Sequence, residues 1–432
     1  MTFKSFIITA VILISFPMLA LAAGSETSRQ YVADFYNRYS RNFDELGLVY
    51  SVPDYGIDYF KTATTPRELM SLATYYRFRA EGGEQQAQQI IRQALQQSDK
   101  LLNQQLPITF SFEDAAAQFL MWQMTTDVPL GLSMGESWGY RQRVIGRAKA
   151  GIAAPDTENR AVLSAAYWQY IVNQASLAGM ITPVDKFNLD IKIKEKIDKA
   201  LADNVNTVGW YEEGSPKVFN PHYHLITAFY TMAYGELTYN TGYVDLAKKM
   251  AANLRQVSFA SGMVEAGLGP RPVGLGAQFY LGAGLLNWRA GYADYGAYLN
   301  FAWGDRFFSD ASFPNRLEYH ATMAEREIGF HDDYAFSNLA ELALALPFFN
   351  GKQIDFADSL RIPPNSGGIA NDGQTIVYKN KKYSLLRNIT SVQLLEPEHS
   401  AQIKTEVLGS VWNSDLQWKP RIKLLLQSIN LF

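Results

Sequence analysis

Helical periodicity is the feature that most constrains the fold, because it recurs through most of the chain. Near the start, Tyr31, Phe35, Tyr39 and Phe43 follow one another at four-residue spacing. That spacing places apolar side chains on one face of a helix. Helices are therefore expected at Glu26–Leu46, Pro66–Arg79, Glu84–Leu102, Phe112–Met124, Asp156–Leu177, Lys186–Val205, Pro221–Tyr239, Tyr243–Val257, Leu275–Ala302, Leu317–Ile328 and Ser337–Leu346.

These helices follow one another in pairs, joined by loops of varied length and without a fixed sequence repeat. Composition changes at Pro363–Gly368, and short strands are expected beyond it at 375–378, 382–386 and 391–395. The prediction is a mainly α chain, with a helical domain over residues 23–362 and a small β-rich region over 363–432. Because so few strands are marginally stable alone, we expect them to dock on the helices.

The first 22 residues have the pattern of a signal peptide. Lys4 precedes an almost wholly apolar run from Phe6 to Leu19, and Ala20-Leu21-Ala22 fits a cleavage site with small residues. The alternative is an uncleaved anchor, since the run is near the lower limit for spanning a bilayer. Cleavage predicts export to a bacterial periplasm or beyond, and no second apolar run is long enough to span a membrane.

Composition excludes several classes of function. The chain has no cysteine, which rules out disulfides and thiolate chemistry. Its formal net charge of −3 gives no basic footprint for nucleic acid. Aromatic residues make up 13% of the chain, which suits stacking on sugar rings and equally suits a large helical core.

The segment 209–224 concentrates polar and aromatic residues in one loop that leads into a helix. Trp210 and Tyr211 are candidates for stacking on a sugar, and Glu213 is either a substrate contact or part of a solvated turn. Asn220 is the expected N-cap of the next helix, with Pro221 in its first position. This loop is the strongest candidate for a functional site.

Two histidines and three tyrosines follow within the same helix. His222 and His224 lie in its first turn, where the helix dipole disfavours the imidazolium, so a neutral ring could accept a proton. Either histidine could instead bond to loop carbonyls. In a regular helix Tyr223, Tyr230 and Tyr234 share one face, as hydroxyls lining a site or as packing residues.

Four further positions or segments carry candidate chemistry. Arg271 lies between two prolines in a glycine-rich loop, a stiff setting that suits a guanidinium binding a carboxylate or sulfate; a simple turn between helices is the alternative. Asn159 opens a helix, where helix capping is the alternative role, and His320 follows a tyrosine farther along. His331-Asp332-Asp333 could bind a divalent metal, but a solvated loop accounts for it, so no metal is assigned.

The order of these residues resembles the α/α-toroid polysaccharide lyases, including the chondroitin and hyaluronate, alginate and heparinase types. Asn159, then His222, then a tyrosine of the next helix and then Arg271 is similar to the Asn-His-Tyr-Arg order of the chondroitin and hyaluronate type. The resemblance implies an α/α toroid, with paired helices in a full or incomplete barrel. The C-terminal β region is far smaller than the sandwich domains of many such lyases.

The resemblance implies β-elimination on a uronic acid, with an acidic polysaccharide or oligosaccharide as partner and no cofactor. Asn159 and His222 would neutralise the sugar carboxylate, a tyrosine or histidine would remove the C5 proton, and Arg271 would steady the anionic sugar. One alternative is a glycoside hydrolase that pairs Glu213 with Asp332 or Asp333. Another is a non-catalytic protein for glycan binding or exopolysaccharide assembly.

Overall fold

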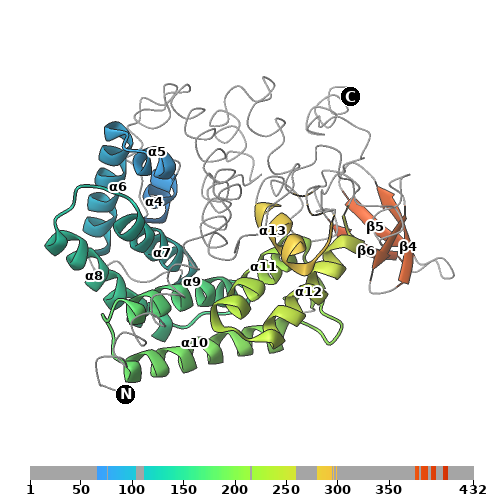
Figure 1. The fold of residues 1–432 in the computed structure, drawn as a ribbon. Coiled ribbons are helices and arrows are strands. Elements are labelled where there is room, and N and C mark those ends of the chain that lie inside the picture. The colour runs from blue at the N-terminus through green and yellow to red at the C-terminus, as the bar shows by residue number, and fades with distance from the viewer. Residues whose placement is uncertain are drawn as a thin grey trace, which may run out of the picture.

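The computed structural model describes residues 66–74, 76–103, 111–214, 217–258, 280–293, 295 and 298, and four strands after residue 374. Within these residues the chain is mainly helical, which confirms the predicted class (Figure 1). The predicted helices at 26–46, 317–328 and 337–346 and the segment 1–22 lie outside the described residues. The helices are α4 (Pro66–Thr74), α5 (Arg77–Glu81), α6 (Gln85–Asn103), α7 (Ser111–Asp127), α8 (Met134–Ala153), α9 (Glu158–Leu177), α10 (Pro183–Asn204), α11 (Pro221–Thr238), α12 (Thr241–Gln256) and α13 (Tyr280–Ala290).

The helices form a curved array of two rows. Helices α4, α7, α9, α11 and α13 make an inner row, in which each helix contacts the next one in the row. Helices α6, α8, α10 and α12 make an outer row on the convex side, and each packs on the inner helix that precedes it (Figure 1). The chain thus alternates between the two rows, as expected for paired antiparallel helices.

Burial differs between the two rows. Helix α9 is buried on nearly every side, from Ala161 through Val172, because α7, α8, α10 and α11 all contact it. The outer helix α10 buries a single stripe, Leu189, Ile193, Ile197 and Leu201, at four-residue spacing. A helix that is apolar all round belongs in a core, and an amphipathic one belongs at the surface. The sequence pattern of each helix therefore assigns it to its row.

Aromatic contacts connect three successive inner helices. The ring centroids of Phe119 on α7 and Tyr167 on α9 are 4.9 Å apart, and those of Tyr167 and Tyr230 on α11 are 5.3 Å apart. Tyr167 Oη and Tyr230 Oη also share a hydrogen bond of 2.7 Å. Near the other end of the same pair of helices, Asn173 Nδ2 donates to the carbonyl of Leu237. Because both contacts join residues 63 or 64 positions apart, α9 and α11 run parallel.

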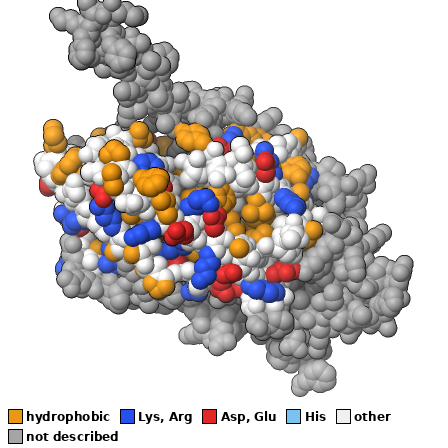
Figure 2. All heavy atoms as spheres, turned by 90° about the horizontal axis from the view of Figure 1, so that it is seen from below, with side chains coloured by type: hydrophobic (Ala, Val, Ile, Leu, Met, Phe, Trp, Pro, Cys, Tyr) orange, Lys and Arg blue, Asp and Glu red, His pale blue; other side chains and the backbone are white. Residues whose placement is uncertain are grey.

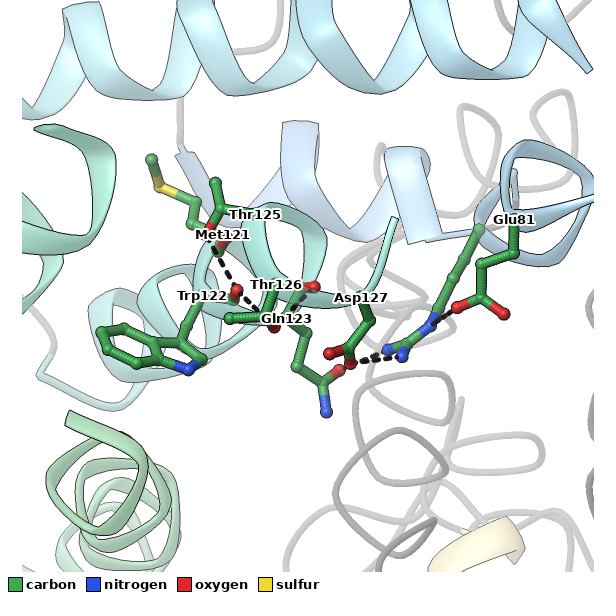
Figure 3. Close-up of polar contacts among 8 residues, drawn as sticks. Glu81, Met121, Trp122, Gln123, Thr125, Thr126 and Asp127 are labelled. Carbon is green, nitrogen blue, oxygen red and sulfur yellow. Dashed lines mark hydrogen bonds and ion pairs between the residues drawn. The ribbon is translucent and has the colours of Figure 1, made fainter. Parts of the chain in front are cut away.

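A buried guanidinium ties α5 to α7. Arg77 is 5% exposed and donates through Nε to Glu81, through Nη1 to Gln123 Oε1 at 2.7 Å and through Nη2 to Asp127 Oδ2 at 2.8 Å (Figure 3). Burial raises the pKa of nearby Tyr170 to about 12. A buried guanidinium that is hydrogen-bonded to two carboxylates and an amide typically has a structural role. Removing the guanidinium or one of the carboxylates would leave a buried charge uncompensated.

Two predicted helices begin or end differently in the structure. The helix predicted over Pro66–Arg79 is divided into α4 and α5, because the backbone tightens where the Tyr76 amide donates to the Ala73 carbonyl. The helix predicted over Leu275–Ala302 ends at Ala290, because Gly291 adopts φ +88°, a left-handed conformation that terminates a helix.

Helix α8 was not predicted at all, although its sequence carries a start signal. Ser133 Oγ accepts the Glu136 amide at 3.2 Å, and the Glu136 carboxylate accepts the Ser133 amide at 2.7 Å. This reciprocal pair is a capping box, readable as Ser-x-x-Glu. Helix α10 likewise begins at Pro183 instead of Lys186, because Thr182 caps it by accepting the Asp185 amide.

The described residues beyond 374 are four strands, β3 (Thr375–Tyr378), β4 (Lys381–Arg387), β5 (Ser391–Leu395) and β6 (Gln402–Glu406). They pair antiparallel in sequence order, with Tyr378 opposite Lys381 at the first turn. Strand β3 lies against α12. The rest of 363–432 lies outside the described residues, so the extent of a β-rich region there stays a prediction.

The face of the molecule seen from below carries both signs of charge, interspersed with apolar side chains (Figure 2). On α10, which runs along that side in Figure 1, Lys186 pairs with Asp190 at 2.5 Å and Lys194 pairs with Asp198. Among the described helices, none combines the length and apolar character needed to cross a membrane.

The close approach of α8 and α9 generates a stability prediction. A Cβ added at Gly151 would lie 2.5 Å from Trp168 Cζ2, and Trp168 is fully buried. Gly151→Ala should therefore destabilise the protein by about 1–3 kcal/mol through overpacking. Gly146→Ala in the same helix meets nothing within 4 Å and should stabilise by about 0.5–1 kcal/mol through helix propensity. Urea unfolding of both variants measures the contrast, and equal effects would contradict it.

Candidate functional site

The loop between α10 and α11 is a folded hairpin. Strands β1 (Glu212–Glu213) and β2 (Val218–Phe219) pair antiparallel, and an isolated bridge joins Val205 to Tyr211. Before them, Asn206 Oδ1 accepts the Trp210 amide at 3.0 Å, in a turn where Gly209 adopts φ +84°. The hairpin therefore has its own hydrogen bonds and can hold side chains in fixed positions.

Trp210 of this loop and His224 in the first turn of α11 both lie in the core. Trp210 is fully buried and packs edge-on against Phe219, with ring centroids 4.8 Å apart. His224 is also fully buried, and its centroid lies 5.5 Å from that of Trp210. Sequence reasoning expected Trp210 to stack on a sugar and His224 to contact substrate. In the structure, Trp210 has its surface covered by protein and His224 has both ring nitrogens in hydrogen bonds.

Those two hydrogen bonds define the protonation state of His224. Its Nδ1 accepts the Tyr211 amide at 3.1 Å, and its Nε2 lies 2.8 Å from the Met250 carbonyl of α12. Since a carbonyl can only accept, the proton is on Nε2 and the ring is neutral. Burial lowers the pKa of His224 to about 4, and the Met250 carbonyl opposes this shift. His224 thus connects α12 to the backbone of Tyr211.

Tyr211 brings together two sequence motifs that are 52 residues apart. Its Oη accepts the backbone amide of Asn159 at 3.1 Å and donates to Glu213 Oε2 at 3.0 Å. Burial, followed by the charge and hydrogen bond of Glu213, raises the pKa of Tyr211 far above its ordinary value. Tyr211 is therefore a neutral phenol with its proton directed at Glu213, and it cannot act as a base near neutral pH.

The first turn of α9 forms the other side of this site. Thr157 is the N-cap, but its side chain makes no capping bond. Asp156 instead accepts the Thr157 amide at 3.1 Å and the Ser164 hydroxyl at 3.0 Å. Asn159 is 8% exposed, and none of the described residues hydrogen-bonds to its side-chain amide.

Tyr223 is the tyrosine of α11 beside this site. Its ring centroid lies 6.5 Å from that of Tyr211, in an edge-on arrangement, and its side chain is half-buried. Its backbone amide donates to Asn220 Oδ1 at 3.3 Å, so Asn220 caps α11 as predicted. The start of α11 therefore places Tyr223 next to Tyr211 and the start of α9.

Tyr230 and Tyr234 lie farther along α11, with other partners. A rise of about 1.5 Å per residue puts them about 10 Å and about 16 Å from Tyr223 along the axis. Tyr230 bonds to Tyr167, and Tyr234 packs 5.0 Å from the ring of Tyr243. Both are buried, and burial raises the pKa of Tyr234. A single small reaction centre cannot include all three predicted tyrosines.

The remaining predicted site residues have no described side chain. His222 is the second residue of α11, but its side chain lies outside the described part. Arg271 and His320 lie wholly outside it. Among the residues that the structure describes, no group of three or more His, Cys, Asp or Glu could hold a metal ion. The arrangement brings together Asn159, Tyr211, Glu213 and Tyr223.

Glu158 is a feature of the site that sequence reasoning missed. It adopts φ +57° at the first position of α9, in a region that favours glycine. Its carboxylate lies 3.9 Å from Arg160. Strained backbone of this kind is concentrated at functional sites. No sequence signal marks it, since Glu in the first turn of a helix is ordinary.

Comparisons of the chain with protein-family models, with curated proteins and with solved structures found no match.

The buried neutral His224 generates a prediction about pH. An unfolded histidine has a pKa of about 6.5, so the unfolded chain binds more protons than the folded one between that value and about 4. The stabilisation is complete above this window and is lost as the pH falls through it, by on the order of 3 kcal/mol.

His224→Gln should lower stability at pH 7 and remove this contribution, so its deficit relative to wild type should shrink as the pH falls from 7 to 4.5. Urea unfolding at several pH values measures the difference. A deficit that is constant across the range would show that His224 is not held neutral.

Proposed function

We propose that this chain is an exported polysaccharide lyase that cleaves an acidic, uronic-acid-containing glycan by β-elimination. We further propose that the two-row helix array of α4–α13 is part of an α/α toroid. The alternation of inner and outer helices supports that architecture, as does the parallel course of α9 and α11.

One observation carries the functional proposal. Asn159 and Tyr223, which come from separate motifs, lie beside the same buried phenol, that of Tyr211. The resemblance to lyases of this type requires an asparagine and a tyrosine to act together. Both residues lie in the first turn of their helices, and the N-termini of these two parallel helices carry partial positive charge. That charge suits the carboxylate of a uronic acid.

The chemistry follows from the acidity of the sugar. The proton at C5 becomes removable once the neighbouring carboxylate is neutralised or hydrogen-bonded, a role for the Asn159 amide and for His222. Tyr223 then exchanges a proton with the sugar, as the base at C5 or as the acid at the leaving oxygen. Tyr211 cannot take the place of Tyr223, because the Tyr211 hydroxyl already donates its hydrogen bond to Glu213. Arg271 would steady the anionic sugar, and no cofactor is required.

Elimination leaves an unsaturated uronate, which absorbs ultraviolet light, whereas hydrolysis does not. Alginate, hyaluronan, chondroitin, heparan and pectin should be offered to the purified protein, with absorbance and reducing ends both recorded. We expect one of them to yield both signals. Reducing ends without the chromophore would indicate a glycoside hydrolase, and binding without either would indicate a non-catalytic protein.

The choice of tyrosine has its own test. Tyr223→Phe should lower the turnover number by about 10²- to 10⁴-fold, the usual contribution of general acid–base catalysis. Tyr234→Phe should retain activity, because that residue lies against Tyr243 and away from Asn159. Circular dichroism should verify that both variants fold. Loss of activity only in Tyr234→Phe would show that the site is wrongly placed.

Export has a separate and simpler prediction. Expressed with its full sequence in a Gram-negative host, the protein should be recovered from the periplasm or medium with residue 23 at its N-terminus, after cleavage behind Ala22. Mass spectrometry of the intact protein measures this. An intact N-terminus in the membrane fraction would indicate an anchor instead.

A further inference from the structure

The first turn of α9 is strained and lacks the usual means of holding it. Glu158 adopts φ +57°, and the N-cap residue Thr157 makes no side-chain capping bond. The Asn159 amide, one of the donors left over at any helix start, must find its acceptor elsewhere. Strained backbone persists only where surrounding contacts over-determine it.

That acceptor is Tyr211 Oη, and Tyr211 is fixed at both ends. Its hydroxyl oxygen accepts a hydrogen bond from the Asn159 amide at 3.1 Å, and the hydroxyl donates a hydrogen bond to Glu213 at 3.0 Å. Its backbone amide donates to His224 Nδ1 at 3.1 Å, while His224 Nε2 donates to the Met250 carbonyl at 2.8 Å. A continuous chain of hydrogen bonds therefore runs from α12 through the hairpin to the start of α9.

We propose that Tyr211 is a positioning residue whose hydroxyl holds the strained first turn of α9, so that the Asn159 side chain is presented in a fixed geometry. The proton arrangement supports this role over direct substrate contact, since the single hydroxyl proton is already given to Glu213. The inference rests on the proposed function only for what Asn159 does with a substrate. The holding of the turn stands without it.

Hydrogen exchange tests the positioning without any substrate. In Tyr211→Phe the Asn159 amide should exchange about tenfold faster than in wild type, measured against reference amides in α10, because its hydrogen bond is lost. Tyr140→Phe, which alters a buried tyrosine of α8, should leave Asn159 exchange unchanged. Unchanged exchange in Tyr211→Phe would overturn the proposal. If that variant does not fold, Glu213→Ala replaces it: it removes the acceptor that orients the Tyr211 hydroxyl, so the phenol can turn away from the Asn159 amide, which should then exchange faster. No acceleration would overturn the proposal.

A double-mutant cycle tests whether the hydroxyl maintains the strain. Glu158→Gly relieves a positive φ and should raise the urea midpoint of the wild type. In the Tyr211→Phe background the turn has already relaxed, so Glu158→Gly should have a much smaller effect. Glu158→Gln removes the charge near Arg160 but keeps the strain, and should show no such dependence. Additive midpoints for Glu158→Gly would overturn the proposal.

Activity provides the last readout, on whichever glycan yields the unsaturated product. Tyr211→Phe should lower kcat at least tenfold while KM changes by less than about threefold, as expected for lost positioning of a group used in the transition state. A tenfold or larger rise in KM with kcat retained would indicate that Tyr211 contacts the substrate, and would overturn the proposal. If the wild-type protein is inactive on every glycan, the proposed function is wrong, but the proposed role of Tyr211 is not affected. Hydrogen exchange at Asn159 and the double-mutant cycle still test that role.

Discussion

The structure depends on the need to cover α9 on all sides. From Ala161 to Val172 the helix has no face that could be left in water, so one neighbour is not enough. Helices α7 and α11 flank it within the inner row, and α8 and α10 close the outer side. The approach of α8 is close enough to exclude even a methyl group at Gly151. The two-row arrangement is the consequence, because only alternating long helices can surround a central one in this way.

Among the described residues, the helices that cover the sides of α9 do not supply hydrogen-bond acceptors for the backbone amides of its first turn. For the Asn159 amide the acceptor comes from the hairpin between α10 and α11, through Tyr211 Oη. The hairpin can reach that point because Trp210 and His224 anchor it in the core against Phe219 and α12. Residues that looked reactive in the sequence therefore divide into two groups. Trp210 and His224 hold the hairpin, and Tyr211 and Glu213 act at its outer end.

The sequence predicted the helices best where periodicity and caps agreed. Asn220 and Pro221 gave the start of α11 correctly, since an N-cap and a first-turn proline are local signals. The capping box of α8 was an equally local signal and was readable at Ser133 and Glu136. The break at Tyr76 was not readable, because it depends on backbone tightening and on the burial of Arg77 against α7.

Sequence reasoning named Asn159, Tyr211 and Tyr223, but it could not predict how the structure brings them together. Periodicity correctly put Tyr223, Tyr230 and Tyr234 in one helix, but the neighbours that separate them belong to α9 and α12. Nor could periodicity show that Tyr211 and Asn159 meet, since they are 52 positions apart and a full helical pair lies between them. The roles of Tyr211 and His224 follow from the hydrogen bonds that each already makes within the protein.

Those hydrogen bonds also narrow the chemistry. The Tyr211 hydroxyl has a single hydrogen to donate. While it is hydrogen-bonded to Glu213, it cannot be donated to a substrate oxygen. His224 has one free lone pair in its neutral form, and the Tyr211 amide occupies it. At this junction the hydrogen bonds of Tyr211 and His224 are therefore used within the protein, and the ring of Tyr223 lies edge-on to that of Tyr211. Neither Tyr211 nor His224 can act on a ligand without giving up a hydrogen bond that ties the hairpin to α9 or to α12.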